Sequence, residues 1–319
     1  MADTVATRPR MLIDCDPGVD DAVMLVCAAA YADVVAVTTV NGNVGLDLTT
    51  RNALAVTELL GWRVPVHAGA ARALLAGPVA AAEVHGDTGL RGADLPLPTR
   101  TAGKDGIEVL IETTRAEEGL SLLATGPLTN VALALRADDA MARRLAGICL
   151  MGGSALGGNV TAAAEFNLYA DPEAAAVVFG ADCAVRMCGL DLTHQVTTSP
   201  AFATRVRAVG GPAATLVAGI VDAQLATFGQ YATSTAEPPL HDPVALLALT
   251  HPHLFTSTAT PIHVETAGTH ARGATVVDRR ILTTQGATPG TTDFRTEWVH
   301  TVDAPAALAL VVDACRHWA

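Results

Sequence analysis

The sequence has few aromatic residues, no run of basic residues and no long uninterrupted hydrophobic run. Phosphate groups are bound by clustered Lys and Arg, so the lack of a basic run argues against nucleic acid or an anionic membrane surface as a partner. The formal net charge of −12 argues the same way. Apolar windows such as 22–32 and 215–221 are shorter than the ~20 residues of a membrane-spanning helix. We therefore expect neither a nucleic-acid nor a membrane partner.

Two further absences concern the cellular compartment. Only Met11, Leu12 and Ile13 follow the basic residues near the N-terminus, whereas the apolar region of a signal peptide needs ~7–15 residues. The 6 Cys residues stand in apolar surroundings without CxxC spacing, and the chain is too long for a disulfide scaffold. We expect a cytoplasmic protein whose thiols are reduced and buried.

What the sequence does contain is a large supply of small apolar side chains. Of its 319 residues, 50% are hydrophobic and 16% are charged, a composition that excludes a disordered chain. Aromatic residues make up only 4%, so the core is expected to consist mainly of small side chains such as Ala and Val. No linker rich in Pro, Ser or charge divides the chain, and we predict one domain over 1–319.

Short apolar strands alternate with helical patterns through the first two thirds of the chain. Strands are predicted at 10–14, 33–40, 64–68, 120–124 and 148–151, and helices at 20–30, 46–60, 107–117 and 128–136. The segment 199–230 is predicted to be wholly helical, later strands are expected at 262–265, 274–277 and 297–301, and a closing helix at 304–315. Such alternation predicts an α/β fold with a mainly parallel sheet.

Polar residues concentrate where the predicted strands end. They lie at 14–16, 41–43, 125–130 and 151–154, each directly after a predicted strand. Ligands of open parallel sheets bind beyond the carboxyl ends of the strands. We therefore expect these four segments to meet at one rim of the sheet.

The densest of these segments is 14–21 (DCDPGVDD), which places four carboxylates in eight residues. Helix capping would account for one or two of them. A hard divalent cation such as Ca²⁺ or Mg²⁺ would account for the others, because no His or Cys ligand is nearby. We favour the metal interpretation.

Two Asp-Pro pairs open predicted helices further along the chain. Capping suffices for Asp171, which precedes Pro172. Asp242 stands beside His241 at the start of an apolar helix, where a carboxylate without a partner would be costly. Asp242 would therefore complete a metal site, while the residue pattern leaves open whether His241 is structural or functional.

A Gly-rich connection at 157–171 carries Asn159, Glu165 and Asn167. Carboxylate and amide groups together recognise vicinal hydroxyls, although an ordinary turn with Asx hydrogen bonds explains the same residues. The glycine spacing fits neither a dinucleotide fingerprint nor a P-loop, and no GxSxG or HExxH motif is present. A nucleotide cofactor is not supported.

The motifs taken in order resemble the nucleoside hydrolases, in particular the inosine-uridine-preferring type. The resemblance spans almost the whole chain and is carried by the segments 14–21, 41–43, 125–130, 165–167 and 241–243. It implies a Rossmann-like α/β fold, with a mostly parallel mixed sheet flanked by helices. It also implies a homodimer or homotetramer.

The resemblance also implies roles for individual residues. A Ca²⁺ would be held by Asp16, Asp21, the main-chain carbonyl of Thr125 and Asp242. Asp20 would be the general base, and His241 would approach the base or its leaving nitrogen. The ribose would be bound by Asn43, Asn159, Glu165 and Asn167, with Met151 nearby. Contacts to the base are expected from Gln224, Phe228 and Tyr231, and from the region around His85.

The implied reaction is hydrolysis of the N-glycosidic bond of a ribonucleoside to free base and ribose, through an oxocarbenium-like state. A haloacid-dehalogenase-like phosphatase also begins with a strand and Asp-x-Asp, but Gly follows its second Asp directly, whereas Pro17 follows here. A second alternative is a nucleoside-binding protein without turnover, against which the intact Asp20 argues. A hydrolase of a modified nucleoside is a third, and the sequence leaves open the preference for purine or pyrimidine.

Overall fold

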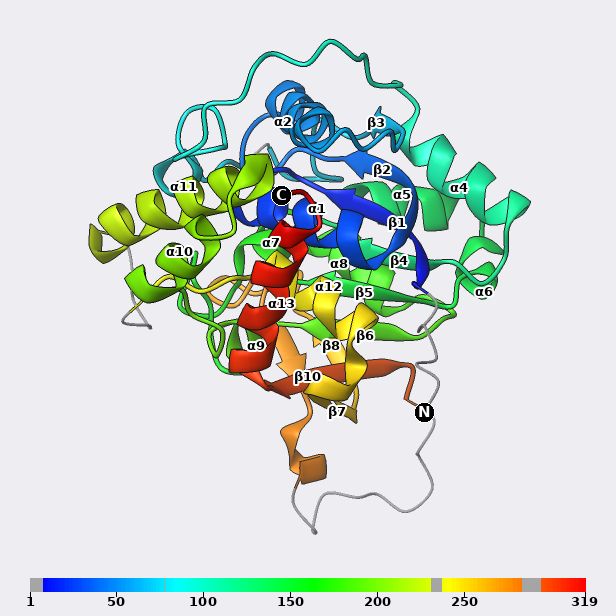
Figure 1. The fold of residues 1–319 in the computed structure, drawn as a ribbon. Helices are drawn as coiled ribbons and strands as arrows, with labels where there is room; N and C mark the ends of the chain where they lie inside the picture. The colour runs from blue at the N-terminus through cyan, green and yellow to red at the C-terminus, as the bar shows by residue number, and fades with distance from the viewer. Residues whose placement is uncertain (1–7, 78, 231–236, 283–293) are drawn as a thin grey trace, which may run out of the picture.

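The structure is a computed structural model that describes residues 8–77, 79–230, 237–282 and 294–319. Its centre is a sheet with the strand order β3-β2-β1-β4-β5-β6-β10-β7 (Figure 1). The bounds in that order are Val66–Ala68, Asp33–Thr39, Arg10–Cys15, Ser121–Ala124, Gly147–Met151, Val185–Cys188, Thr296–Val302 and Phe255–Ala259. Neighbouring strands are parallel except β10 and β7, which are antiparallel. The predicted mostly parallel mixed sheet is confirmed.

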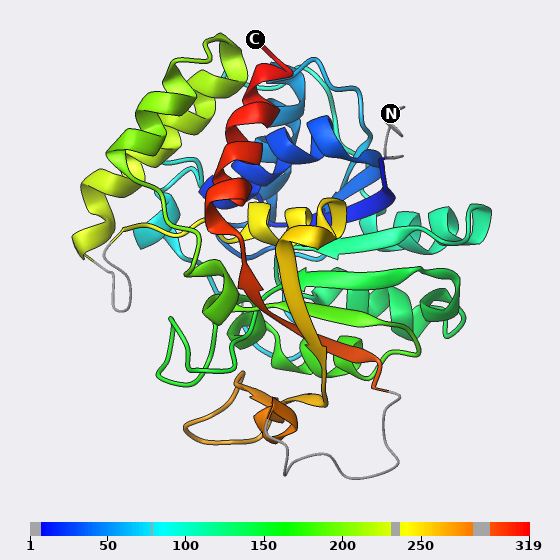
Figure 2. The same ribbon diagram turned by 60° about the horizontal axis from the view of Figure 1, so that its bottom comes forward.

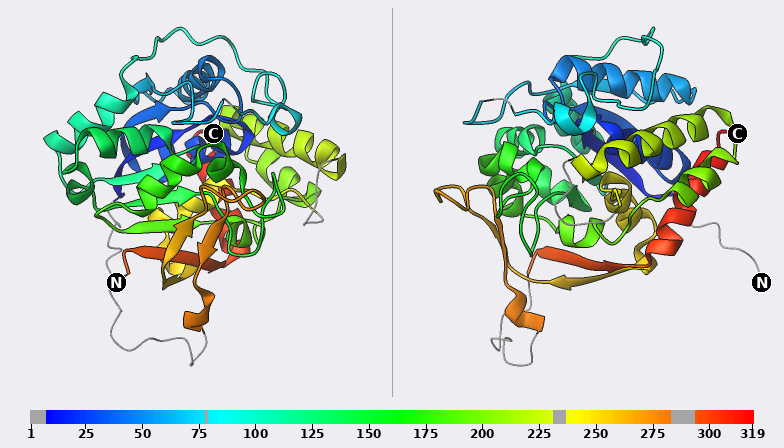
Figure 3. Two further views of the ribbon diagram at one scale, coloured as in Figure 1. Left: turned by 180° about the vertical axis from the view of Figure 1, so that it is seen from behind. Right: turned by 90° about the vertical axis from the view of Figure 1, so that its left-hand side faces the viewer.

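Helices cover both faces of this sheet. Their bounds are α1 Val19–Tyr31, α2 Leu46–Leu59, α3 Ala82–His85, α4 Gly106–Ala116, α5 Thr129–Ala137, α6 Met141–Arg144, α7 Phe166–Ala170, α8 Pro172–Phe179, α9 Leu190–Thr193, α10 Pro200–Arg207, α11 Gly211–Thr227, α12 Asp242–Thr250 and α13 Ala304–Arg316. In Figure 1, α1, α12 and α13 lie in front of the sheet, and the view from behind in Figure 3 brings α4 and α5 forward.

Strand β1 shows how the sequence builds a core on each face. Successive side chains of a strand point to opposite faces. Met11 and Ile13 accordingly join the core formed with α1, α11, α12 and α13, while Leu12 joins the core formed with α4, α5 and α8. All three side chains are fully buried. A continuous apolar strand is therefore what a sheet covered on both faces requires.

The segment 199–230 is not one helix, and our prediction there was wrong. It divides into α10, α11 and a short 3-10 turn at Phe228–Gln230. The break falls at Gly210, whose φ of +77° belongs to the left-handed region that a right-handed helix cannot contain. The apolar pattern continues across this glycine and hid the break.

Two strands were missed. β6 is only four residues long and contains Arg186, and β7 is an edge strand with a mixed, partly exposed pattern. The strands predicted at 262–265 and 274–277 do form, but as a separate antiparallel pair, β8 (Ile262–Val264) and β9 (Thr275–Val277). This pair extends from the body of the molecule (Figure 2).

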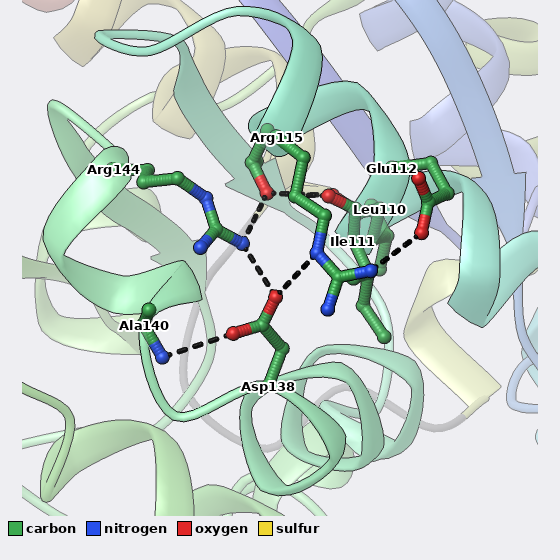
Figure 4. A network of polar contacts seen from close by, with 8 residues as sticks. Leu110, Ile111, Glu112, Arg115, Asp138, Ala140 and Arg144 are labelled. Atoms are coloured by element: carbon green, nitrogen blue, oxygen red, sulfur yellow. Dashed lines mark hydrogen bonds and ion pairs between the residues drawn. The ribbon is translucent and has the colours of Figure 1, made fainter.

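An ion-pair network joins α4 to the connection between α5 and α6 (Figure 4). Asp138 Oδ2 accepts hydrogen bonds from Arg115 Nε at 2.9 Å and from Arg144 Nη2 at 2.8 Å. The Arg144 guanidinium is the first of the contacts that lower the pKa of Asp138, from 3.8 to about 2. The network therefore favours the ionised carboxylate.

All six Cys residues are buried and free of disulfides, as predicted. In the residues that the structure describes, no helix is both long enough and apolar enough to cross a membrane.

Candidate active site

Four loops that follow parallel strands meet at one edge of the sheet. Asp16 follows β1, Asn43 lies in the loop after β2, Thr125 follows β4, and Met151 ends β5. The loop after β2 reaches that after β1, because the backbone N of Asn43 donates to Asp16 Oδ2 at 2.7 Å. The predicted rim is therefore built from the carboxyl ends of strands, as expected for an open parallel sheet.

A cavity of about 450 Å³ opens at this edge. Of the predicted site residues, those that line it are Asp20, Asn43, His85, Thr125, Met151, Asn159, Glu165, Asn167, Gln224, Phe228, His241 and Asp242. Asp16 and Asp21 lie beneath the lining and are fully buried. Tyr231 falls outside the described residues. The structure thus brings together residues that the sequence separates by more than two hundred positions.

The buried carboxylates are held by amide and hydroxyl donors. Asp21 accepts from Thr125 Oγ1 at 2.8 Å and from Asn43 Nδ2 at 3.2 Å. Asp16 Oδ1, by contrast, is buried without a hydrogen-bond partner among the described residues. A Cβ at Gly126 would lie 2.7 Å from this atom, so glycine is needed for the close approach of the main chain. An unpaired, buried carboxylate oxygen is the kind of atom that a cation would satisfy.

The electrostatics of the cluster support the same conclusion. Burial raises the pKa of Asp21 to about 6 and holds the pKa values of Asp16 and Asp242 well above their ordinary range. Repulsion from Asp21 adds to the pKa increase at Asp16, and the carboxyls of Asp21 and Asp242 hydrogen-bond each other. Within the described ranges, no group of three or more His, Cys, Asp and Glu side chains is arranged so that it could already hold a metal ion. The oxygen-only donor set nevertheless fits a hard divalent cation.

Asp20 points into the cavity and is held by two N–H donors. Gln224 Nε2 donates to its Oδ1 at 3.0 Å, and the backbone N–H of His241 forms a second hydrogen bond. Burial nevertheless raises the pKa of Asp20 to about 6. Asp20 is therefore ionised at neutral pH, yet it is a stronger base than an exposed aspartate.

Three histidines lie around the same cavity and are neutral at pH 7. Burial lowers the pKa of His85 to about 3, and the pKa values of His194 and His241 to about 4. Nδ1 of His85 accepts a hydrogen bond from Val19 N at 3.2 Å, which ties it to the start of α1. His241 faces the cavity and pairs its Nδ1 with Thr193 Oγ1 at 2.8 Å.

The Gly-rich connection at 157–171 also contributes to the wall of the cavity. Asn167 Nδ2 donates to the carbonyls of Thr125 at 2.8 Å and of Met151 at 3.1 Å, which locks the amide in place. Glu165 caps α7 by accepting from the backbone N of Asn167 at 2.9 Å, and burial raises its pKa to about 7. Asn159 lies at the exposed end of this wall. These residues make the local hydrogen bonds of an ordinary turn and also line the cavity. Both interpretations of the segment, as a turn and as a ligand-binding wall, therefore apply.

Some lining residues were not predicted. His194 was missed because β6 was missed, although the sequence GLDLTH after Cys188 is another polar cluster that follows a strand. Glu83 of α3 and the pair Pro238 and Pro239 also line the cavity. No local signal marks these residues, since their position depends on how the loops cross the sheet edge. Asp171, by contrast, caps α8 as predicted, accepting from Ala174 N at 3.1 Å.

The sheet order, the buried carboxylates and the adjoining cavity are the arrangement of an α/β enzyme whose site lies at the carboxyl ends of its strands. A family model described as inosine-uridine preferring nucleoside hydrolase matches residues 11–309. The chain belongs to this family. It is a ribonucleoside hydrolase, which releases free base and ribose, and the family is metal-dependent.

Two curated relatives illustrate the similarity. The pyrimidine-specific ribonucleoside hydrolase RihA of Enterobacter sp. (strain 638) is 42% identical over 287 residues, covering 88% of this chain and 91% of that protein. RihA of Photobacterium profundum is 40% identical over 282 residues, covering 87% and 91%. Among solved structures, a purine-preferring ribonucleoside hydrolase from Gardnerella vaginalis aligns with a TM-score of 0.88 and 28% identity, covering 97% of this chain and 98% of that chain.

Proposed function

We propose that this enzyme depends on calcium and prefers pyrimidine ribonucleosides. The substrate preference is supported by the pyrimidine-specific relatives, which are 40–42% identical over most of the chain. The solved purine-preferring relative is less similar, at 28% identity. The observation that carries the mechanism is Asp20, which faces the cavity beside a cluster of three further carboxylates.

We assign the calcium ligands to Asp16, Asp21, Asp242 and the carbonyl of Thr125. The orphaned Asp16 Oδ1 and the raised pKa values of the three carboxyls support this assignment. When bound, Ca²⁺ would orient the ribose diol and make a water molecule more acidic. Asn43 would hold two of these carboxylates in place through its backbone and side-chain N–H groups.

Asp20 acts as the general base in this proposal. It takes a proton from water while the water oxygen bonds to C1′ of the ribose. Its two N–H partners, Gln224 and the backbone of His241, fix the direction of the carboxylate. The C1′–N bond breaks and its electron pair goes to the base. The base finally acquires one proton, which balances the proton that Asp20 removed.

The cavity walls divide the remaining tasks. Asn159, Glu165 and Asn167 would bind the ribose, with Asn43 and Met151 next to it. Phe228 and His85 would contact the base, as would Tyr231, which is assigned from the sequence alone. His241 would donate a hydrogen bond to the departing base through Nε2. This bond is strongest when negative charge develops on the base, so it lowers the barrier to departure.

The test is release of reducing sugar by the purified protein from uridine, cytidine, inosine, adenosine and guanosine, with 2′-deoxy controls. The protein is first treated with a chelator and then titrated with Ca²⁺. We expect turnover of uridine and cytidine at the highest kcat/KM, none without Ca²⁺, and strong loss on the 2′-deoxy compounds. Binding of uridine without any turnover would support the nucleoside-binding alternative, and turnover of inosine, adenosine or guanosine alone would overturn the substrate assignment.

Two further predictions concern the state of the enzyme in the cell. We propose that it is cytoplasmic and assembles as a homodimer or homotetramer. Light scattering of the purified protein measures the mass, and a monomer at micromolar concentration would contradict the assembly prediction.

A further inference from the structure

Thr193 contacts His241, which the proposed mechanism uses, but Thr193 itself has no role in that mechanism. It is the last residue of α9, and its side chain is fully buried. Its Oγ1 lies 2.8 Å from Nδ1 of His241, a residue 48 positions later in the chain. The contact is therefore made by the tertiary fold and not by local chain geometry.

The short helix that carries Thr193 is fixed on two sides. The backbone N of Leu190 donates to the carbonyl of Gly153 at 2.9 Å. The Asp191 carboxylate accepts from Ala155 N at 2.8 Å and from Trp298 Nε1 at 2.6 Å. These bonds join α9 to the loop after β5 and to β10. Thr193 is thus presented to His241 from a rigid support, which is what precise orientation of a ring requires.

The need of the buried Thr193 hydroxyl for an acceptor indicates the tautomer of His241. A threonine hydroxyl carries one hydrogen, and among the described residues Nδ1 of His241 is the hydrogen-bond partner found for Thr193 Oγ1. The hydroxyl is buried and no other acceptor for its hydrogen is found among the described residues, so donation to Nδ1 satisfies it and places the ring proton on Nε2. No described residue forms a hydrogen bond with Nε2, and the ring lines the cavity. Nε2–H is therefore available to a ligand.

We propose that Thr193 is a positioning residue that holds the His241 ring with Nε2–H directed at the departing base. The inference rests on the proposed role of His241 as the donor to that base. Without the hydroxyl, the ring has no partner at Nδ1 and is free to place its proton there. Nε2 would then be an acceptor, which repels the negative charge that develops on the base.

Kinetics on two leaving groups test the proposal. The variants are Thr193→Val, which keeps the volume and removes the hydroxyl, Thr193→Ser, which keeps the hydroxyl, and His241→Ala. The matched control is Thr114→Val, because Thr114 is also fully buried and its hydroxyl lies away from the cavity, where it donates to carbonyls of α4 and accepts from Arg144 Nη2 at 3.3 Å. Each variant is assayed on uridine and on 4-nitrophenyl β-D-ribofuranoside, whose leaving group departs without a hydrogen-bond donor.

We expect Thr193→Val to lower kcat for uridine by about 10- to 100-fold, a fraction of the ~10²–10⁴-fold effect of a complete acid–base group. The kcat of Thr193→Val for the nitrophenyl riboside should stay within about twofold of the kcat of the parent enzyme. Thr193→Ser, which keeps the hydroxyl, should retain the uridine turnover of the parent enzyme. An unchanged kcat for uridine, or an equal loss on both substrates, would overturn the proposal. If His241→Ala has no selective effect on uridine, the proposed role of His241 fails first, and the inference fails with it.

A spectroscopic measurement tests the tautomer directly. The ¹⁵N shifts of labelled histidine distinguish a ring protonated at Nε2 from one protonated at Nδ1, and the spectrum of His241→Ala identifies the signals. We expect the Nε2–H form in the parent enzyme and a mixture or the Nδ1–H form in Thr193→Val. A dominant Nδ1–H form in the parent enzyme would refute the assignment.

Discussion

Replacing Asp242 by Asn separates two effects of the carboxylate cluster on stability: the cost of burying charge in the metal-free protein, and the stabilisation that bound calcium provides. Asp242 is buried, hydrogen-bonds Asp21, and has a pKa well above its ordinary range. Without a cation, burial therefore penalises the ionised form, which at neutral pH destabilises the metal-free fold. Asn has nearly the same shape and supplies an N–H donor for Asp21, but it carries no charge to desolvate. We expect metal-free Asp242→Asn to be at least as stable as the metal-free parent enzyme.

Calcium should reverse the order of stabilities. A ligand present at 100 times its dissociation constant stabilises the native state by ~2.7 kcal/mol. For a chain of 319 residues, whose unfolding entropy is about 0.67 kcal/mol/K, that corresponds to a rise in Tm of roughly 4 °C. The variant lacks one charged ligand, so most of this rise should be lost at the same Ca²⁺ concentration. Thermal unfolding followed by circular dichroism, in chelator and in a Ca²⁺ titration, measures both quantities.

The measurements with and without Ca²⁺ test different parts of the prediction. Equal Ca²⁺-induced shifts in the parent enzyme and the variant would remove Asp242 from the ligand set. A metal-free variant markedly less stable than the metal-free parent would show that the Asp242 carboxyl stabilises α12 by more than its burial costs. That result would refute the electrostatic reasoning, because a charge at a helix N-terminus contributes only about 0.3–1 kcal/mol in ordinary settings.

Three other predictions concern single residues. Asp20→Asn should keep Ca²⁺ affinity by calorimetry but lower kcat by ~10²–10⁴-fold, and parent-like turnover would disprove the general-base role. Asp138→Asn should lower Tm at pH 7, because the pKa of Asp138 in the folded state, about 2, lies below its ordinary 3.8. The stabilisation by the ionised Asp138 is complete above pH 3.8 and is lost as the pH falls toward 2, so the difference in Tm between variant and parent should narrow below about pH 4. A difference in Tm that stays constant with pH would contradict this prediction. Leu110→Ala, at a fully buried position between α4 and the sheet, should cost ~2–5 kcal/mol in urea unfolding, and a loss below ~1 kcal/mol would show that the site collapses around the truncation.

The sequence predicted best those elements whose signal is local. The continuous apolar strands β1 and β2 and the Asp-Pro helix starts at Asp171 and Asp242 were all identified, because burial on both faces and a Pro in the first turn of a helix leave clear patterns. β6 and β7 were not identified, since a short strand with Arg186 and a partly exposed edge strand lack those patterns.

The candidate site follows the same division. The acidic segment 14–21 could be recognised in the sequence by its density of negative charge. The cavity lies at the carboxyl ends of the strands, where a ligand site was predicted. The contact between Thr193 and His241 could not be predicted, because it depends on how α9 packs against the start of α12. Contacts of this kind are set by tertiary packing, which residue type and spacing do not record.

The long sequence separations within the site bear on how the enzyme is made. Asp21 and Thr125 are 104 positions apart, and Asp20 and Gln224 are 204 apart. In a chain emerging from the ribosome, most carboxylates of the site are therefore synthesised long before the residues that bond to them in the folded protein. Asp242 is the last member of the proposed ligand set to be synthesised. High-affinity calcium binding should consequently appear only when α12 has docked against α1, and would then drive the late stage of folding instead of its nucleation.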